Sequence, residues 1–421
     1  MRQKDWWKKA VIYELYVDKF AGDFRGLTGR LDYFTWLGVN TLWILPHYPS
    51  PMIDGGYDIT DYLGVRPDLG TMGDFDNFLA AAHGRGLKVM IDMVLNHTSD
   101  KHPWFRQKKD WYLWSKTPDK FAGADNPFPY VKEKNWVWDG RVGEYYYATF
   151  YPEQPDLNWD NPEVFDQMMK VMGFWLSRGV DGLRLDAIAR LVKREGTDCW
   201  GLPETHGILK KIRGHIEGRY KNVALMAETG GLPEEAAVFF GQGDECQMVL
   251  NFQLAAKMLL AIKRGDKRVV EEVWEGVGKI PQECEWAVFL TSHDTVSLFL
   301  LPDKEKNELI AAVDPGAEWS WKKGSKMAVR LAEVCGGNVK KIVGATKMLL
   351  AQPGVPIIYY GEEMGMRNEE LAAKPVDSRE FVRGKFDWEE AKRQMGDPKS
   401  VLNGVRRVIL KRTADRTFSG L

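Results

Sequence analysis

This chain of 421 residues has little cysteine, no strong charge of one sign and no very long apolar run. Its four cysteines (Cys199, Cys246, Cys284 and Cys335) are scattered without metal-ligand spacing, so we expect reduced thiols in a cytoplasmic protein. The net charge is −1 and no long block of one sign occurs, which argues against a nucleic-acid partner. No apolar run is long enough to span a bilayer, and MRQKDWWKK lacks the apolar core of a signal peptide, so we expect no membrane contact.

A glycine-rich phosphate-binding loop is also missing. AGDFRG, after the first expected strand, does not have the G-x-G-x-x-G spacing, which argues against a doubly wound nucleotide-binding fold. Aromatic residues, in contrast, are abundant, with 17 Trp, 15 Tyr and 19 Phe. Most of them are expected in the core, but aromatic faces also stack against the apolar faces of sugar rings. A neutral small molecule fits this composition better than a polyanion.

Short apolar runs alternate with amphipathic stretches of helical period along most of the chain. Near-continuous apolar strands alternating with helices predict an α/β fold with a covered parallel sheet, and eight repeats predict its closure into a (β/α)₈ TIM barrel. The expected strands cover residues 10–17, 40–46, 87–97, 182–187, 223–229, 247–252, 287–294 and 355–364.

One interval interrupts this alternation. Residues 98–160 are aromatic, punctuated by proline and glycine, and poor in helical period, which predicts a small irregular domain inserted after strand 3. The barrel would then comprise residues 1–97 and 161–421. After residue 365, FDWEEAKRQ and VLNGVRRVILKR predict helices, and no run of strands follows, so we expect no C-terminal β-sandwich.

Ionisable residues stand at the ends of several expected strands, where the loops of a barrel converge on one rim. In chain order these residues are Asp92 with Asn96 and His97, Arg184 with Asp186, Glu228, His293 with Asp294, and Glu362 with Glu363. Polar residues begin at any strand end, so a single carboxylate would indicate little. Several on one rim favour a shared active site.

Paired carboxyl groups on neighbouring strands suit glycosidic chemistry, in which one attacks the anomeric carbon and the other protonates the departing oxygen. Retention of configuration requires the pair to lie about 5 to 5.5 Å apart. Arg184 lies on the same strand face as Asp186 and should favour its ionised form. Crowding and partial burial should leave the proton on Glu228.

The ordered motifs DMVLNH (92–97), GLRLD (182–186), LMAET (225–229) and SHD (292–294) resemble the four signature regions of the α-amylase superfamily, glycoside hydrolase family 13. QPDLN (154–158) resembles a fifth region found in the oligo-1,6-glucosidase and trehalose synthase branch. The resemblance covers about residues 5 to 365, and stretches such as LPHYPSPMIDGGYDITDY and FFGQGDEC are most similar to the trehalose synthase branch.

The resemblance implies a retaining enzyme that acts on an α-linked disaccharide or oligosaccharide through a covalent glucosyl-Asp intermediate. Its catalytic residues would be Asp186 as nucleophile, Glu228 as acid/base and Asp294 as third carboxylate. Tyr57 would stack beneath the glucosyl ring, His97 and His293 would donate hydrogen bonds to it, Asp58 would hold its far hydroxyls, and Arg383 would pair with Asp58.

Maltose and trehalose interconversion is the activity that the resemblance favours. An α-glucosidase or a sucrose-type hydrolase or transglucosylase is the near alternative. A non-catalytic barrel that binds sugar or a protein partner is the alternative from another class, because Thr291 and Ser292 precede His293-Asp294 where relatives read RNHDE. Gly230 and Gly231 soon after Glu228 also depart from the relatives and should alter the acceptor side of the pocket.

Calcium is held in many family members by the asparagine of the first region, the aspartate of the fifth, and an acidic residue beyond the nucleophile. Asn96 and Asp156 are present here, but Lys193 occupies the third position. A lysine ammonium satisfies the same oxygens and excludes a divalent cation. We therefore expect no metal, and the motifs call for no cofactor.

Overall fold

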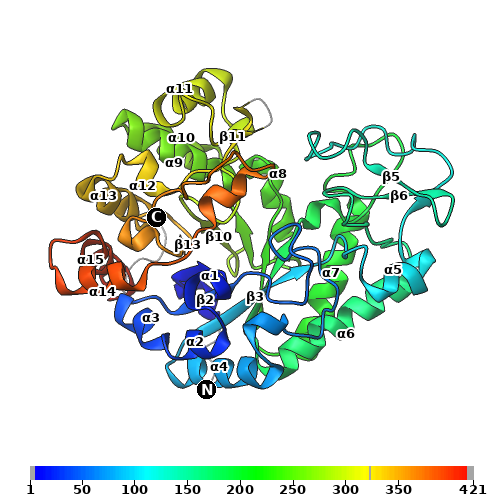
Figure 1. The fold of residues 1–421 in the computed structure, drawn as a ribbon, viewed down its shortest axis with the longest axis horizontal. Helices are drawn as coiled ribbons and strands as arrows, with labels where there is room; N and C mark the ends of the chain where they lie inside the picture. Colours follow the sequence, from blue (N-terminus) through cyan, green and yellow to red (C-terminus); the bar gives the residue numbers. More distant parts are fainter. Residues whose placement is uncertain (1–4, 322–323, 415–421) are drawn as a thin grey trace.

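The barrel is closed by eight parallel strands in the order β1-β13-β10-β9-β8-β7-β3-β2 (Figure 1). The structure, a computed structural model, describes residues 5–321 and 324–414. The barrel strands are β1 Ile12–Leu15, β2 Thr41–Ile44, β3 Lys88–Val94, β7 Gly182–Asp186, β8 Ala224–Ala227, β9 Met248–Leu250, β10 Glu285–Val288 and β13 Val355–Tyr359. Each expected run overlaps one of these strands, so the predicted (β/α)₈ barrel is confirmed. Residues 1–4, 322–323 and 415–421 of the predicted barrel segments lie outside the described residues.

The strands are buried along nearly their whole length, as expected of a parallel sheet covered by helices. The register between β3 and β7 places Asp92 beside Arg184 and Val94 beside Asp186. Because side chains alternate along a strand, Arg184 and Asp186 share one face. The pairing therefore brings Asp92, Arg184 and Asp186 to one end of the barrel.

Helices surround the strands in Figure 1. The α-helices of the described residues are α1 Val17–Ala21, α2 Phe24–Thr28, α3 Leu31–Leu37, α4 Met72–Gly84, α5 Pro103–Gln107 (in the segment between β3 and β7), α6 Pro162–Arg178, α7 Pro203–Glu217, α8 Pro233–Ala237, α9 Phe252–Arg264, α10 Arg268–Gly276, α11 Asp303–Val313, α12 Leu331–Val334, α13 Val339–Leu350, α14 Trp388–Gly396 and α15 Val401–Ala414. The local sequence explains the ends of α6: Asn161 caps its first turn, Pro162 takes the first position and Gly179, at φ 109°, ends it.

The predicted helices near the end of the chain correspond to α14 and α15, and no strand follows β13 within the described residues. A short antiparallel pair, β11 Ser320–Trp321 and β12 Lys326–Met327, lies between β10 and β13. None of the helices in the described ranges has the length and apolarity needed to cross a bilayer.

The segment between β3 and β7 leaves the barrel and carries a small sheet of its own. Strands β4 Trp114–Ser115, β6 Glu144–Tyr147 and β5 Trp136–Asp139 pair antiparallel in that order. Figure 1 shows this sheet beside the barrel, above α5 and α7. The sequence predicted an irregular insertion here and did not predict the sheet. The boundaries of this insertion at residues 98 and 160 stay a prediction.

Candidate active site

A cavity of about 710 Å³ lies at the carboxyl ends of the barrel strands, and Asp186, Glu228 and Asp294 all line it. Asp186 is the last residue of β7 and Glu228 directly follows β8. Asp294 lies in a loop and not at a strand end, because β10 ends at Val288 and the following loop leads to the cavity. The structure thus brings the three predicted carboxylates together around one space.

Arg184 lies beneath these carboxylates and is almost fully buried. Its Nη1 donates to Oδ1 of Asp92 and Oδ1 of Asp186, each at 2.5 Å, and its Nη2 lies 3.2 Å from Oε2 of Glu228. Oε2 of Glu228 also accepts a hydrogen bond of 2.8 Å from the backbone N–H of Ala187. The nucleophile candidate and the acid/base candidate therefore share one guanidinium group.

The surroundings of Asp186 and Asp294 shift their pKa values in opposite directions. Burial raises the pKa of Asp186 well above its ordinary value; the charge of Arg184 opposes this shift, and Glu228 and Asp92 add to it. The predicted contact with Arg184 is present, but it does not outweigh burial. Asp186 must therefore lose its proton before it can act as a nucleophile, and the contact with Arg184 favours the ionised form.

Burial also acts to raise the pKa of Asp294, but nearby positive charge prevails. Arg379 contributes most to lowering this pKa, and its Nη1 donates to Oδ1 of Asp294 at 3.2 Å. Asp294 therefore stays ionised at neutral pH and can accept hydrogen bonds from sugar hydroxyls.

The predicted pair of Asp58 and Arg383 is wrong. Asp58 is fully buried and accepts hydrogen bonds from Ser50 and from the backbone of Ile53 and Asp54, so it holds its own loop. Arg383 instead donates from Nε to the backbone oxygen of His293 at 3.0 Å. Neither residue lines the cavity.

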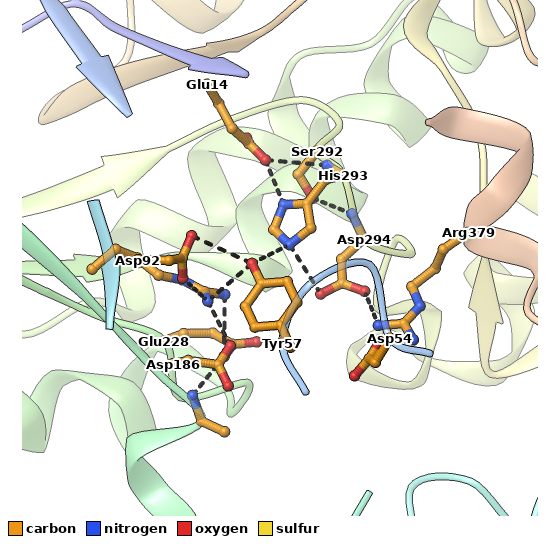
Figure 2. Close-up of polar contacts among 12 residues, drawn as sticks. Glu14, Asp54, Tyr57, Asp92, Asp186, Glu228, Ser292, His293, Asp294 and Arg379 are labelled. Carbon is orange, nitrogen blue, oxygen red and sulfur yellow. Dashed lines mark hydrogen bonds and ion pairs between the residues drawn. The ribbon is translucent and has the colours of Figure 1, made fainter. Parts of the chain in front are cut away.

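Asp54 and Arg379 form the ion pair at the cavity, with 2.5 Å between Oδ1 of Asp54 and Nη2 of Arg379. Asp377 contacts the same guanidinium: it forms an ion pair with Nη2 and accepts a hydrogen bond from Nε. The sequence interpretation did not assign Asp54 or Arg379 to the site, although Asp54 lies three residues before Tyr57, which it did assign. The pair joins the loop after β2 to the segment after β13 across one wall of the cavity (Figure 2).

The two predicted histidines lie on different sides of the site. His97 lines the cavity, and burial lowers its pKa to about 4, so the ring is neutral at pH 7. His293 is buried behind Tyr57, with 2.8 Å between His293 Nε2 and the Tyr57 hydroxyl, and the two rings stack at 12°. Burial lowers the pKa of His293 as well. Tyr57 itself lines the cavity and can present its ring to a sugar.

Lys193 lies where the sequence places it, between Asn96 and Asp156. Its ammonium donates to Oδ1 of Asn96 at 2.9 Å and to the backbone oxygen of Arg190 at 2.5 Å, and it forms an ion pair with Asp156. The Lys193 ammonium already occupies the space between these oxygens, so they do not fit a calcium ion in addition. In the described ranges, no group of three or more His, Cys, Asp or Glu residues is arranged to bind a metal.

Glu362 and Glu363, expected on the shared rim, face away from it. Oε1 of Glu363 accepts hydrogen bonds from the hydroxyls of Tyr13 and Tyr33, and Glu362 accepts from the backbone N–H of Leu331. Both side chains are buried among these partners. The prediction that they belong to the shared rim is therefore wrong. The chain forms a short 3₁₀ helix soon after β13, and this helix directs both side chains into the interior.

Comparison with known proteins agrees with this arrangement: the chain belongs to the α-amylase family, whose catalytic domain matches residues 5–401. It is similar to trehalose synthase of Pimelobacter sp. (strain R48), with 38% identity over 86% of this chain and 67% of that protein. With trehalose synthase of Thermus thermophilus it shares 40% identity over 91% of this chain and 41% of that protein. The chain thus spans 41 to 67% of the length of these two relatives.

Solved structures give the same result for the fold. The trehalulose synthase MutB from Pseudomonas mesoacidophila MX-45 is 25% identical, with a TM-score of 0.75 over 97% of this chain and 84% of that one. An isomaltulose synthase from Klebsiella sp. LX3 is 25% identical, with a TM-score of 0.76 over the same shares.

Proposed function

We propose that this chain transfers α-glucosyl units with retention of configuration and interconverts maltose and trehalose. The main support is the geometry at the cavity wall, where Asp186 and Glu228 both contact the buried guanidinium of Arg184. The names of the trehalose synthase relatives supply the substrate pair. A cavity of about 710 Å³ has room for a disaccharide.

The proposed reaction has two displacements. Asp186 attacks the anomeric carbon while Glu228 gives its proton to the departing glycosidic oxygen, so that a glucosyl-Asp186 ester and a free sugar form. Glu228, now a carboxylate, takes a proton from a hydroxyl of the acceptor, which attacks the same carbon and releases Asp186. Arg184 orients both carboxyl groups, and Asp294 accepts hydrogen bonds from the ring hydroxyls.

The choice between transfer and hydrolysis depends on whether glucose or water reaches the intermediate. Phe128 of the inserted segment lines the cavity, and its ring lies 4.9 Å from that of Trp321 on β11. Arg379 also lies over the Phe128 ring, with its guanidinium carbon 5.3 Å from the ring centroid. These contacts join the insertion to the barrel across the cavity, which favours retention of the released glucose.

Product analysis with maltose, trehalose and sucrose tests the proposal, using the wild type, Asp186→Ala, and Asp303→Ala as a surface control. The wild type and the control are expected to convert maltose to trehalose with little free glucose, and Asp186→Ala to lose at least about 1,000-fold in rate. Glucose as the main product would indicate an α-glucosidase, and consumption of sucrose alone a sucrose-type enzyme. Sugar binding by the wild type without turnover would indicate a binding barrel.

A further inference from the structure

Glu14 on β1 is a fully buried carboxyl group next to the site that no step above uses. Its Oε1 lies 2.5 Å from Nδ1 of His293 and also accepts from the backbone N–H of His293 at 3.2 Å (Figure 2). Its Oε2 has no hydrogen-bond partner among the described residues. An ionised carboxylate with one unpartnered oxygen is costly to bury.

The charges that face Glu14 do not compensate such an ion. Arg184 on β7 is the nearest cation, but its Nη1 already contacts Asp92 and Asp186. Asp92 on β3 and Asp294 after β10 repel a negative charge on Glu14, and Tyr359 on β13 is neutral at ordinary pH. Burial consequently raises the pKa of Glu14 to about 8.

The hydrogen bonds of the Tyr57 hydroxyl indicate which nitrogen of His293 carries the proton. Burial raises the pKa of Asp92 to about 6, so Asp92 is ionised at pH 7 and only accepts, while Arg184 only donates. Tyr57 Oη lies 3.4 Å from Asp92 Oδ2 and 3.3 Å from Arg184 Nη1. For all three contacts to be hydrogen bonds, its single proton must go to Asp92, and its oxygen must accept from Arg184 and from His293.

His293 Nε2, at 2.8 Å from the Tyr57 oxygen, must then be the protonated nitrogen. Burial keeps the ring neutral, so it holds one proton only and Nδ1 is bare. A bare Nδ1 at 2.5 Å from Oε1 of Glu14 needs a donor, and only a protonated Glu14 supplies one. The hydrogen bonds thus run in one direction, from Glu14 through His293 and Tyr57 to Asp92.

We propose that Glu14 is a positioning residue whose carboxylic acid donates to Nδ1 of His293 and fixes the ring in the Nε2–H form, facing Tyr57 and Asp294. Loss of one proton from Glu14 reverses the chain. Nδ1 then carries the ring proton and donates to the Glu14 carboxylate, and Nε2 becomes an acceptor for the Tyr57 hydroxyl. Tyr57 and Asp294 line the cavity, so the reversal changes the hydrogen bonding of the side chains that face the bound sugar.

Nitrogen NMR of histidine labelled with ¹⁵N tests the protonation state without any substrate. The protein has seven histidines, and the His293 signals are those lost in His293→Gln. At pH 6.5 we expect Nε2 protonated and Nδ1 bare in the wild type and in Glu14→Gln, whose amide N–H also donates to Nδ1. Above pH 9 the wild type should change to the Nδ1–H form and Glu14→Gln should not. A wild-type Nδ1–H at pH 6.5, or a form unchanged up to pH 10, contradicts the proposal.

Glu363→Gln is the matched control, because Glu363 is also fully buried but contacts Tyr13 and Tyr33. This variant should show the wild-type change of His293 with pH. A His293 signal altered in this control to the same extent as in Glu14→Gln would mean that neutralising any buried glutamate disturbs the ring, which would overturn the specific role of Glu14.

The kinetic measurement rests on the proposed function. Wild-type kcat is expected to fall as the pH rises through about 8, and Glu14→Gln to lack that fall while keeping kcat/KM within about threefold at pH 6.5. Glu14→Leu, which offers no donor, should lose about 100-fold in kcat. A Glu14→Gln loss as large as that of Glu14→Leu contradicts the proposal. An inactive wild type would count against the proposed function alone, because the NMR result still decides the role of Glu14.

Discussion

Replacing Lys193 with methionine is expected to destabilise the protein and leave the active-site carboxylates in place. Lys193 and Asp156 are both almost completely buried, so the variant leaves the Asp156 carboxylate without its cation. Breaking a buried ion pair by removing one partner costs about 3 to 5 kcal/mol. Asp156 keeps hydrogen bonds from the N–H of Thr149 at 2.8 Å and from its hydroxyl at 2.5 Å, which places the expected loss near the lower end.

Urea denaturation followed by circular dichroism measures this loss as a lower midpoint with an unchanged slope. Lys210→Met is the matched control, because Lys210 and Asp244 are 3.2 Å apart with both side chains about half exposed. A pair of that kind contributes about 0 to 1 kcal/mol. If Lys193→Met loses no more free energy of unfolding than Lys210→Met, the buried ammonium does not have the role assigned to it.

A second variant at position 193 tests whether the lysine prevents calcium from binding. Lys193→Asp places a carboxylate beside the oxygens of Asn96 and Asp156, a donor set that suits Ca²⁺. Calcium at 100 times its dissociation constant should stabilise this variant by about 2.7 kcal/mol. The wild type should not respond to calcium. An equal response in both proteins would show that the lysine does not exclude the ion.

Two other predictions concern the site and the pH dependence of stability. Asp54→Asn should lose about 10- to 100-fold in kcat/KM, because it weakens the charge-assisted contact with Arg379 at the cavity, whereas Asp58→Asn should change kcat/KM little; equal losses would contradict the corrected assignment. Burial lowers the pKa of His47 to about 3, so its contribution to stability is complete above pH 6.5 and falls as the pH drops towards 3. Between pH 7 and pH 5 the wild type should lose about 2 kcal/mol more than His47→Phe in urea denaturation, and equal losses would show that the folded ring accepts a proton.

The barrel could be predicted from the sequence because its signals are local. Each buried strand is a short apolar run, and the amphipathic stretches around it have a helical period, so all eight strands were found. The boundaries were less accurate where buried strands pass into loops that are also apolar. Phe289 and Leu290 continue the pattern of β10, although the strand ends at Val288.

The site could be predicted only in part, because a strand end fixes where a side chain begins and not which way it points. Asp186 and Glu228 follow directly from their strands, and the register with β3 explains Arg184. Glu362 and Glu363 also follow a strand, but the turn after β13 directs them into the interior.

The partner of a loop residue depends on how two distant segments pack, which no local pattern contains. Asp54 and Arg379 are 325 residues apart and meet only in the folded protein, so the sequence resemblance assigned the neighbouring Asp58 and Arg383 in their place. Lys193 was placed correctly because the motifs on either side of it fixed its alignment with the oxygens of Asn96 and Asp156.

The central claim, a glucosyl ester on Asp186, is tested most directly by trapping. With 5-fluoro-α-D-glucosyl fluoride, the fluorine at C5 slows both displacements, because both have oxocarbenium-like transition states. The fluoride leaving group keeps formation of the ester faster than its breakdown, so a retaining enzyme accumulates the ester. Mass spectrometry of the digested protein should find one fluoroglucosyl unit on the peptide that contains Asp186, and Asp186→Asn should remain unlabelled. Label on a different residue, or equal labelling of Asp186→Asn, would contradict the account.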